Sequence, residues 1–262
     1  MRARKAALAA ALVAAACHPA APPPPLAPAP AAGEVVLPPD YDPTRAYPVV
    51  EILPATGSTS ETLLQTYLSR VGLGRLYAEP PQRQLEALLP YLFPGTGHAG
   101  HDFVVVLARG RGSADDYASA AKWEGTIARY ERQVLADLRW LASVRRVDTT
   151  RMVLAGLSMG GDLAWAITLR NPGIIHGAIV MASRASYRPE ADAARALALR
   201  GVRFFLTMGD ADDATRRRLA RAAAAMLDRL GVAHRLRMIP GAGHEPAPPA
   251  VFAEALDFVL AP

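Results

Sequence analysis

The sequence contains a single cysteine and, after its first residues, no apolar run long enough to cross a membrane. One cysteine among 262 residues excludes an intrachain disulfide and a zinc site built on several cysteines. Without a run of about eighteen apolar residues, the chain is not a polytopic membrane protein. The net positive charge of the chain is also small. Three of the five net positive charges come from Arg2, Arg4 and Lys5, and no basic face with interleaved aromatic residues follows them, so we expect no nucleic-acid partner.

The N-terminus has the pattern of an export signal. Arg2 to Lys5 precede an apolar run from Ala6 to Ala16, and Cys17 follows. Because such a run is too short to span a bilayer, we expect residues 1–16 to be a cleaved signal peptide and the protein to be exported. The segment Val-Ala-Ala-Ala-Cys resembles a bacterial lipoprotein signal, although Ala14 stands where that family prefers leucine. The resemblance implies acylation of Cys17 and a membrane contact through that anchor alone. The alternative is ordinary secretion with Cys17 as a free thiol.

The residues that follow Cys17 divide into a spacer and one large domain. Residues 17–33 are rich in proline and alanine, a composition that forms extended chain without an apolar face to bury. The body, residues 34–262, is long enough for a single α/β core.

Continuous apolar runs of strand length recur through the body and predict strands that are covered on both faces. They are Tyr47–Leu53, Phe103–Ala108, Met152–Ala155, Gly177–Met181, Val202–Met208 and His234–Ile239. Apolar residues at three- and four-residue spacings predict a long helix from about Glu124 to Val144. Further helices are expected directly after Ser158, over Ala214–Leu230 and over Pro249–Leu260. This alternation predicts an α/β fold with a mostly parallel sheet and helices on both faces.

The most informative segment is Gly156-Leu157-Ser158-Met159-Gly160, which follows an expected strand and precedes an expected helix. A sharp turn at this place exposes the Ser158 hydroxyl at the carboxyl edge of the sheet. Gly156 and Gly160 allow strand and helix to approach closely. We therefore interpret Ser158 as a nucleophile rather than as part of a glycine-rich structural turn.

The segment is similar to the nucleophile elbow of the α/β-hydrolase superfamily. The resemblance covers essentially the whole body, because an acid and a histidine follow in that family's chain order. It implies that Asp212, in the Gly209-Asp210-Ala211-Asp212-Asp213 loop, is the triad acid. Asp210 and Asp213 remain alternatives, and one of the three is expected to cap the helix that follows.

The same resemblance assigns the remaining parts of the site. It implies that His244, in Gly241-Ala242-Gly243-His244, is the catalytic base. The other histidines of the body, His98, His101, His176 and His234, have no such placement. The backbone amide of Met159 and one amide from the loop after Leu53 are the expected oxyanion donors. Relatives often carry His-Gly in that loop, but this chain has Pro54-Ala55, so alignment by the loop assigns Thr56.

Two flanking segments resemble secreted carboxylesterases of the polyhydroxyalkanoate-depolymerase and feruloyl-esterase kind. They are residues 35–50, which include Pro39-Asp40-Tyr41, and residues 145–151 before the elbow strand. Serine peptidases of the prolyl-oligopeptidase type share these features but usually carry an N-terminal propeller. The roughly 30 residues before Glu34 offer no room for one, so we expect an esterase.

The expected function is hydrolysis of a small or polymeric carboxylic ester through an acyl-enzyme on Ser158, with no cofactor and no metal. A thioesterase or acyltransferase with the same triad and a non-catalytic, hydrolase-like surface lipoprotein are the alternatives.

Two further segments could border the substrate pocket. Residues 57–101 are rich in leucine and tyrosine, most of which we expect to pack on the sheet. Residues 183–201 are a candidate lid helix, and Arg184, Arg188 and Arg195 within them are interpreted as a solvated face rather than as a substrate clamp.

Overall fold

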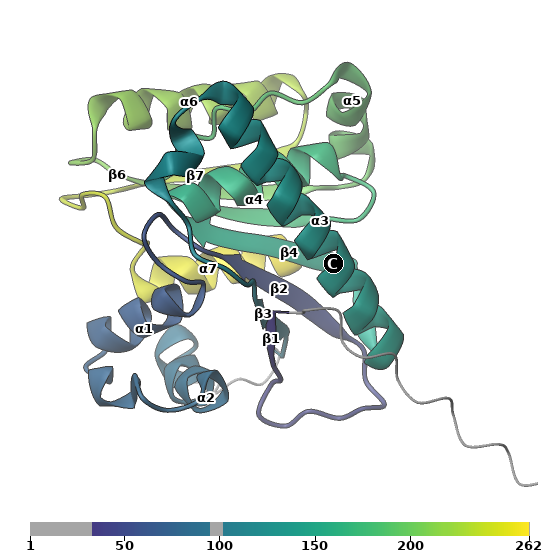
Figure 1. Ribbon diagram of the computed structural model, residues 1–262, viewed down its shortest axis with the longest axis vertical. Coiled ribbons are helices and arrows are strands. Elements are labelled where there is room, and N and C mark those ends of the chain that lie inside the picture. Colours follow the sequence, from purple (N-terminus) through teal and green to yellow (C-terminus); the bar gives the residue numbers. More distant parts are fainter. Residues whose placement is uncertain (1–32, 95–101, 262) are drawn as a thin grey trace, which may run out of the picture.

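The computed structural model describes residues 33–94 and 102–261 (Figure 1). The expected signal peptide, Cys17 and all of the spacer except Gly33 lie outside the described residues, as do His98 and His101. None of the described helices combines the length and the apolar character needed to cross a membrane.

A seven-stranded sheet in the order β1-β3-β2-β4-β5-β6-β7 forms the centre of the molecule. Only β1 is antiparallel to its neighbour, β3, and all other pairs are parallel. The bounds are β1 Glu34–Val36, β2 Tyr47–Leu53, β3 Val104–Leu107, β4 Val147–Leu157, β5 Gly177–Met181, β6 Arg203–Gly209 and β7 Ala233–Ile239. The mostly parallel sheet expected from the apolar runs is therefore confirmed. Strand β4 begins before the expected start at Met152. Its first residues are partly exposed and carry no apolar run, so the apolar pattern does not reveal them.

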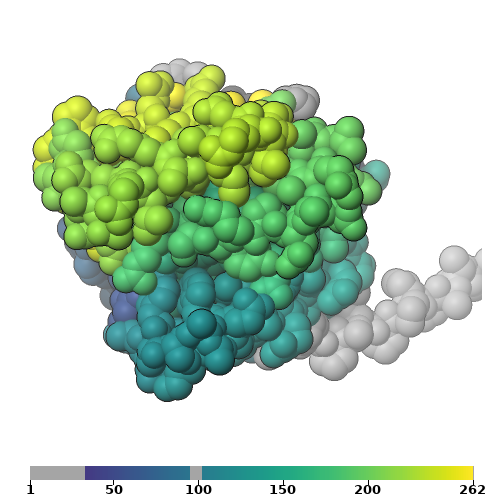
Figure 2. Space-filling model, turned by 90° about the horizontal axis from the view of Figure 1, so that it is seen from above, coloured from purple at the N-terminus to yellow at the C-terminus, as the bar shows by residue number. Residues whose placement is uncertain are grey.

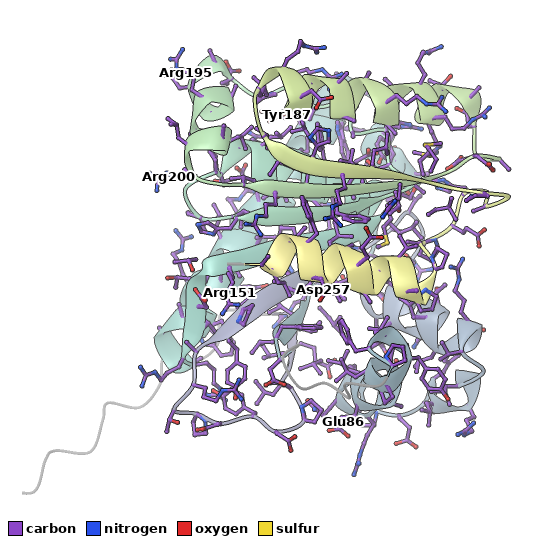
Figure 3. All side chains as sticks on the ribbon, turned by 180° about the vertical axis from the view of Figure 1, so that it is seen from behind. Glu86, Arg151, Tyr187, Arg195, Arg200 and Asp257 are labelled. Atoms are coloured by element: carbon purple, nitrogen blue, oxygen red, sulfur yellow. The ribbon has the colours of Figure 1, made fainter. Side chains whose placement is uncertain are left out.

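Helices cover both faces of the sheet and bury two apolar clusters against it. On one face lie α3 (Ala120–Val144), α4 (Met159–Arg170), α5 (Ala191–Leu199) and α6 (Ala214–Arg229). On the other lie α1 (Glu61–Arg70), α2 (Pro81–Leu92) and α7 (Pro249–Leu260). Helix α3 crosses in front of the sheet in Figure 1, and α7 lies in front of it in the view from behind in Figure 3. Seen from above, α6, α5 and α3 form one continuous surface although they are distant in sequence (Figure 2).

Helix α3 begins four residues before the expected start, and a cap explains the difference. Ser119 is extended and its side chain accepts a hydrogen bond from the Lys122 amide at 3.2 Å. A serine in this position satisfies an amide that the first turn leaves without a partner, which the apolar spacing alone does not reveal.

The leucine-rich segment after residue 57 forms α1, the short 3₁₀ helix η1 (Gly74–Leu76) and α2. Its apolar side chains pack on the sheet, as expected for most of them. The buried members are Leu63, Leu64, Tyr67, Leu68, Leu73, Leu85, Leu88, Leu89, Leu92 and Phe93. Tyr77 and Tyr91 remain exposed.

The candidate lid segment forms α5, but this helix does not cover the carboxyl edge of the sheet. Leu197 is fully buried and α5 packs against α4. Arg195 and Arg200 project at the end of the molecule opposite to the loop that joins β7 to α7 (Figure 3).

One carboxyl group lies inside the core without a hydrogen-bond partner among the described residues. Glu51 of β2 is fully buried, and neither of its side-chain oxygens has a partner. Burial, and then the charge of Asp137 on α3, raise the pKa of Glu51 well above its usual value. Between the pKa of Glu51 in the unfolded chain and its higher pKa in the folded protein, the native state binds more protons than the unfolded state. The free energy of unfolding is therefore highest below the unfolded pKa and falls as the pH rises toward the folded pKa.

We therefore expect the substitution Glu51→Gln to stabilise the protein at pH 8 by about 2 kcal/mol or more, with the gain shrinking toward pH 4. Glutamine has nearly the same shape but carries no charge that alkaline pH would create in the core. Denaturant unfolding at several pH values measures the difference. Glu79→Gln, at an exposed position, is the matched control. Parallel stability curves for wild type and Glu51→Gln would show that Glu51 does not titrate in the core.

Candidate active site

Ser158 occupies a strained turn between β4 and α4. Its φ is +56° and its ψ −114°, a conformation that non-glycine residues rarely adopt. The Ser158 amide donates to the Met181 carbonyl at the end of β5 at 2.8 Å, which holds the turn against the sheet. The side chain makes no capping hydrogen bond to the helix and is free to face outward.

The two glycines of the motif are required by close backbone approaches. A Cβ on Gly156 would lie 2.2 Å from the Gly160 carbonyl carbon, and one on Gly160 would lie 2.4 Å from the Leu53 carbonyl oxygen. Strand β4, helix α4 and the end of β2 therefore meet with no room for a side chain. This contact confirms the close approach expected from the sequence.

His244 lies between Ser158 and Asp212. Its Nε2 is 2.9 Å from Ser158 Oγ and its Nδ1 is 2.9 Å from Asp212 Oδ2. The three residues follow β4, β6 and β7, which are parallel and end at the same edge of the sheet. This edge faces left in Figure 1, where the loop between β7 and α7 emerges. The Asp212 side chain is 3% exposed and that of His244 38% exposed, so the carboxylate is shielded from water while the imidazole reaches the surface.

Contacts between the loops after β6 and β7 hold Asp212 and His244 together. A Cβ on Gly209 would lie 2.1 Å from the Ala242 carbonyl oxygen, so only glycine fits at this crossing. The Ala211 amide donates to the same oxygen at 2.9 Å. The contact between Asp212 and His244 therefore depends on backbone contacts as well as on the side chains.

The three aspartates of the loop after β6 make different contacts. Asp210 accepts a hydrogen bond from the Gly241 amide at 2.7 Å and ties the two loops together. Asp213 caps α6 by accepting from the amides of Thr215 and Arg216. Asp212 alone of the three bonds to His244. The geometry thus distinguishes Asp212 from its two neighbours, of which Asp213 is the expected helix cap.

Both expected oxyanion donors belong to segments that border Ser158. Met159 is the first residue of α4, and the first amides of a helix have no acceptor within it. Thr56 forms an isolated parallel bridge with Gly112, and the Gly57 amide donates to the Gly112 carbonyl at 2.9 Å. A Cβ on Gly112 would lie 2.6 Å from the terminal carbon of Met159, so the two segments are in contact.

A cleft of about 580 Å³ opens at this edge and exposes Ser158 and His244. A volume of this size suits a small ligand. Its lining residues are Ala55, Thr56, Ser58, Ala114, Tyr117, Leu157, Ser158, Arg184, Arg216 and His244. Of the described part of the leucine-rich segment, residues 58–94, only Ser58 is among these. No described residue of α5 lines the cleft, so the lid expected there is absent from this edge.

A buried carboxylate, which the sequence did not single out, holds the cleft wall. Asp162 of α4 is 5% exposed. Its Oδ2 accepts from the Tyr117 hydroxyl at 2.6 Å, and its Oδ1 accepts from the Ser183 hydroxyl and the Arg184 amide. Burial, and then Asp162, raise the pKa of Tyr117 far above its usual value, so this hydroxyl remains neutral. Only the position of Asp162, directly after Gly161, could have drawn attention to it.

His176 and His234 lie away from the cleft, and His234 Nδ1 is 3.0 Å from the Val232 carbonyl oxygen. Within residues 33–94 and 102–261, no three His, Cys, Asp or Glu side chains gather in a group that could hold a metal ion.

The fold is similar to solved structures of esterases and other serine hydrolases. A ferulic acid esterase from Anaeromyces mucronatus is 17% identical with a TM-score of 0.59, over 87% of this chain and 82% of that one. Another ferulic acid esterase is 17% identical with a TM-score of 0.54, over 86% and 90%. A fluorophosphonate-binding serine hydrolase from Staphylococcus aureus is 12% identical with a TM-score of 0.53, over 87% and 91%. At such identities the likeness establishes the α/β-hydrolase fold alone.

The sequence comparison adds the family. A search of the curated proteins found no match. The model of the family described as "Putative esterase" matches residues 29–244, a range that includes the elbow at Ser158, the loop with Asp212 and, as its last residue, His244. Because this match spans most of the chain, the protein belongs to that esterase family.

Proposed function

We propose that the protein is a serine hydrolase that cleaves carboxylic esters through an acyl-enzyme on Ser158. The observation that carries this proposal is the pair of 2.9 Å contacts that His244 makes to Ser158 and to Asp212. A serine hydroxyl is a weak nucleophile unless an adjacent base takes its proton, and a base is effective when a third group orients it. The three side chains supply these parts.

In the proposed reaction, Ser158 Oγ attacks the ester carbonyl carbon and passes its proton to His244 Nε2. The tetrahedral intermediate collapses, the bond to the alcohol oxygen breaks, and His244 gives its proton to the leaving alcohol. Water then attacks the acyl-enzyme with the same proton transfers and releases the acid. Asp212 accepts the hydrogen bond from Nδ1 and stabilises the positively charged imidazole. The amides of Met159 and Thr56 would stabilise the negatively charged oxygen of the intermediates.

The experiment that tests this proposal combines turnover with active-site labelling. A panel of p-nitrophenyl acyl esters, the matching thioesters and methyl ferulate measures hydrolysis, and a fluorophosphonate probe labels an activated serine. Methyl ferulate is included because two of the similar structures are ferulic acid esterases. We expect labelling at Ser158 and ester hydrolysis faster than thioester hydrolysis. A preference for thioesters would indicate the thioesterase alternative, and neither labelling nor turnover would indicate a non-catalytic binding protein.

We also propose that the protein is exported and anchored by lipid at Cys17, on the basis of the N-terminal sequence alone. Mass spectrometry of the mature N-terminus from the native host tests this. We expect cleavage after Ala16 and acyl chains on Cys17, and Cys17→Ser should release the protein from the membrane fraction. An unmodified Cys17 at the mature N-terminus would indicate ordinary secretion.

A further inference from the structure

Two arginines from different elements line the cleft that exposes Ser158. Arg184 belongs to the loop after β5, and Arg216 to the first turn of α6. Their charges both act on the Tyr117 hydroxyl, where they oppose the rise in the pKa of that group. One wall of the cleft therefore carries two positive charges close to the same tyrosine.

Arg184 is held in place at both ends. Its amide donates to the buried Asp162 Oδ1 at 2.8 Å. Its guanidinium carbon lies 4.8 Å from the centre of the Tyr117 ring, and the Tyr117 hydroxyl donates to Asp162 Oδ2. The neighbouring residues Ala182 and Ala185 have φ values of +46° and +45°, which are strained for alanine. A loop fixed in this way presents its charge with little conformational freedom left to lose on binding.

The charge of Arg184 has no carboxylate partner among the residues that the structure describes. Other arginines of the protein often form ion pairs with carboxylates, as Arg170 does with Glu124 and Glu131. Arg216 has only a distant partner, since its Nε is 4.0 Å from Asp212 Oδ1. That carboxylate already accepts hydrogen bonds from His244 and from the Asp213 amide. Asp162, the other carboxylate nearby, is surrounded by its own donors.

We propose that the cleft selects esters that carry a carboxylate, which Arg184 and Arg216 bind while the scissile carbonyl lies at Ser158. The planar guanidinium presents paired N–H donors that match the two oxygens of a carboxylate, and such hydrogen bonds are about twice as strong as neutral ones. The inference rests on the proposed esterase function, because it names the substrate class of that site. It gives Arg184, which lines the cleft, a role other than the solvated face expected from the sequence, whereas Arg188 and Arg195 still fit that expectation because neither lines the cleft.

Paired substrates of matched shape test the proposal. p-Nitrophenyl hydrogen adipate and p-nitrophenyl 6-methylheptanoate have the same acyl chain except at its end. The first ends in a carboxylate and the second in an isopropyl group of similar shape. 4-Acetoxybenzoate and its methyl ester place the charge on the alcohol side instead. We expect wild type to prefer the anion in at least one pair by kcat/KM, and the preference to weaken at high salt. Arg184→Gln should reduce that preference about tenfold or more, and Arg184→Gln/Arg216→Gln should abolish it.

Arg218→Gln, which removes one charge from an exposed position of the same helix α6, is the matched control and should keep the wild-type preference. Arg184→Lys separates charge from shape and should restore part of it. An anion preference that is absent from wild type, or equal in wild type and Arg184→Gln, would overturn the inference. Thermal unfolding of each variant establishes that the comparison is made on folded protein.

A binding measurement separates this inference from the proposed function. Calorimetry of monomethyl adipate with the Ser158→Ala protein should show binding that weakens about tenfold in Ser158→Ala/Arg184→Gln. If wild type hydrolyses neutral esters but neither turnover nor binding depends on Arg184, the anion site is refuted and the esterase proposal stands. If no ester is hydrolysed but binding depends on Arg184, the esterase proposal fails and the carboxylate site stands.

Discussion

Replacing Ser158 by alanine is expected to lower kcat/KM for p-nitrophenyl esters by about 10⁴- to 10⁶-fold. The substitution removes the oxygen that lies 2.9 Å from His244 Nε2, and no other side-chain hydroxyl of the described residues is hydrogen-bonded to His244. The fold should persist, because the Ser158 side chain caps no helix and alanine is no more hindered than serine at this backbone conformation. Steady-state hydrolysis and the thermal unfolding midpoint measure the two effects.

The matched control is Ser186→Ala, at an exposed position of the loop after β5, which should keep wild-type turnover. Fluorophosphonate labelling should be lost in Ser158→Ala and retained in Ser186→Ala. Hydrolysis by Ser158→Ala at a rate near that of wild type would remove Ser158 from the reaction and with it the acyl-enzyme mechanism.

The parts of the fold and site that the sequence predicts are those with a local signal. Buried parallel strands are continuous apolar runs, so β2, β3 and β5 to β7 were expected close to their observed bounds. The nucleophile turn has its own signal in Gly156 and Gly160. The expected positions of Asp212 and His244 depended on chain order and on a resemblance, and the structure brings both side chains to Ser158 because parallel strands end at one edge of the sheet.

Features built from distant contacts could not be predicted. The wall made by Tyr117, Asp162 and Arg184 joins three segments that carry no shared pattern. From the sequence alone, Arg184 is therefore interpreted as part of a solvated face, because an arginine in a polar loop is usually exposed. Glu51 lies within the run Tyr47–Leu53, whose apolar residues predict a strand covered on both faces, but the sequence does not show that this carboxyl group lies in the core beneath α3 without a hydrogen-bond partner among the described residues.

The second large effect is expected from Asp212→Asn, which should lower kcat by about 10⁴-fold. Asparagine keeps the size of the side chain but loses its charge, and its amide can donate toward His244 Nδ1, which favours the tautomer with the proton on Nε2. A base that already carries its proton at that nitrogen cannot accept the one from Ser158 Oγ. The loss should appear equally in the rate of fluorophosphonate labelling, because that reaction requires the same proton transfer.

Two neighbouring aspartates provide matched controls for this loss. Asp210 and Asp213 each accept backbone hydrogen bonds through one side-chain oxygen, and the asparagine carbonyl oxygen can accept the same bonds. Asp210→Asn should therefore keep the contact with the Gly241 amide, and Asp213→Asn should still cap α6, since asparagine is a good N-cap residue. Both variants should stay within a few fold of wild-type kcat. A larger loss in either of them than in Asp212→Asn would mean that the acid acting on His244 is not the one that lies 2.9 Å from its Nδ1.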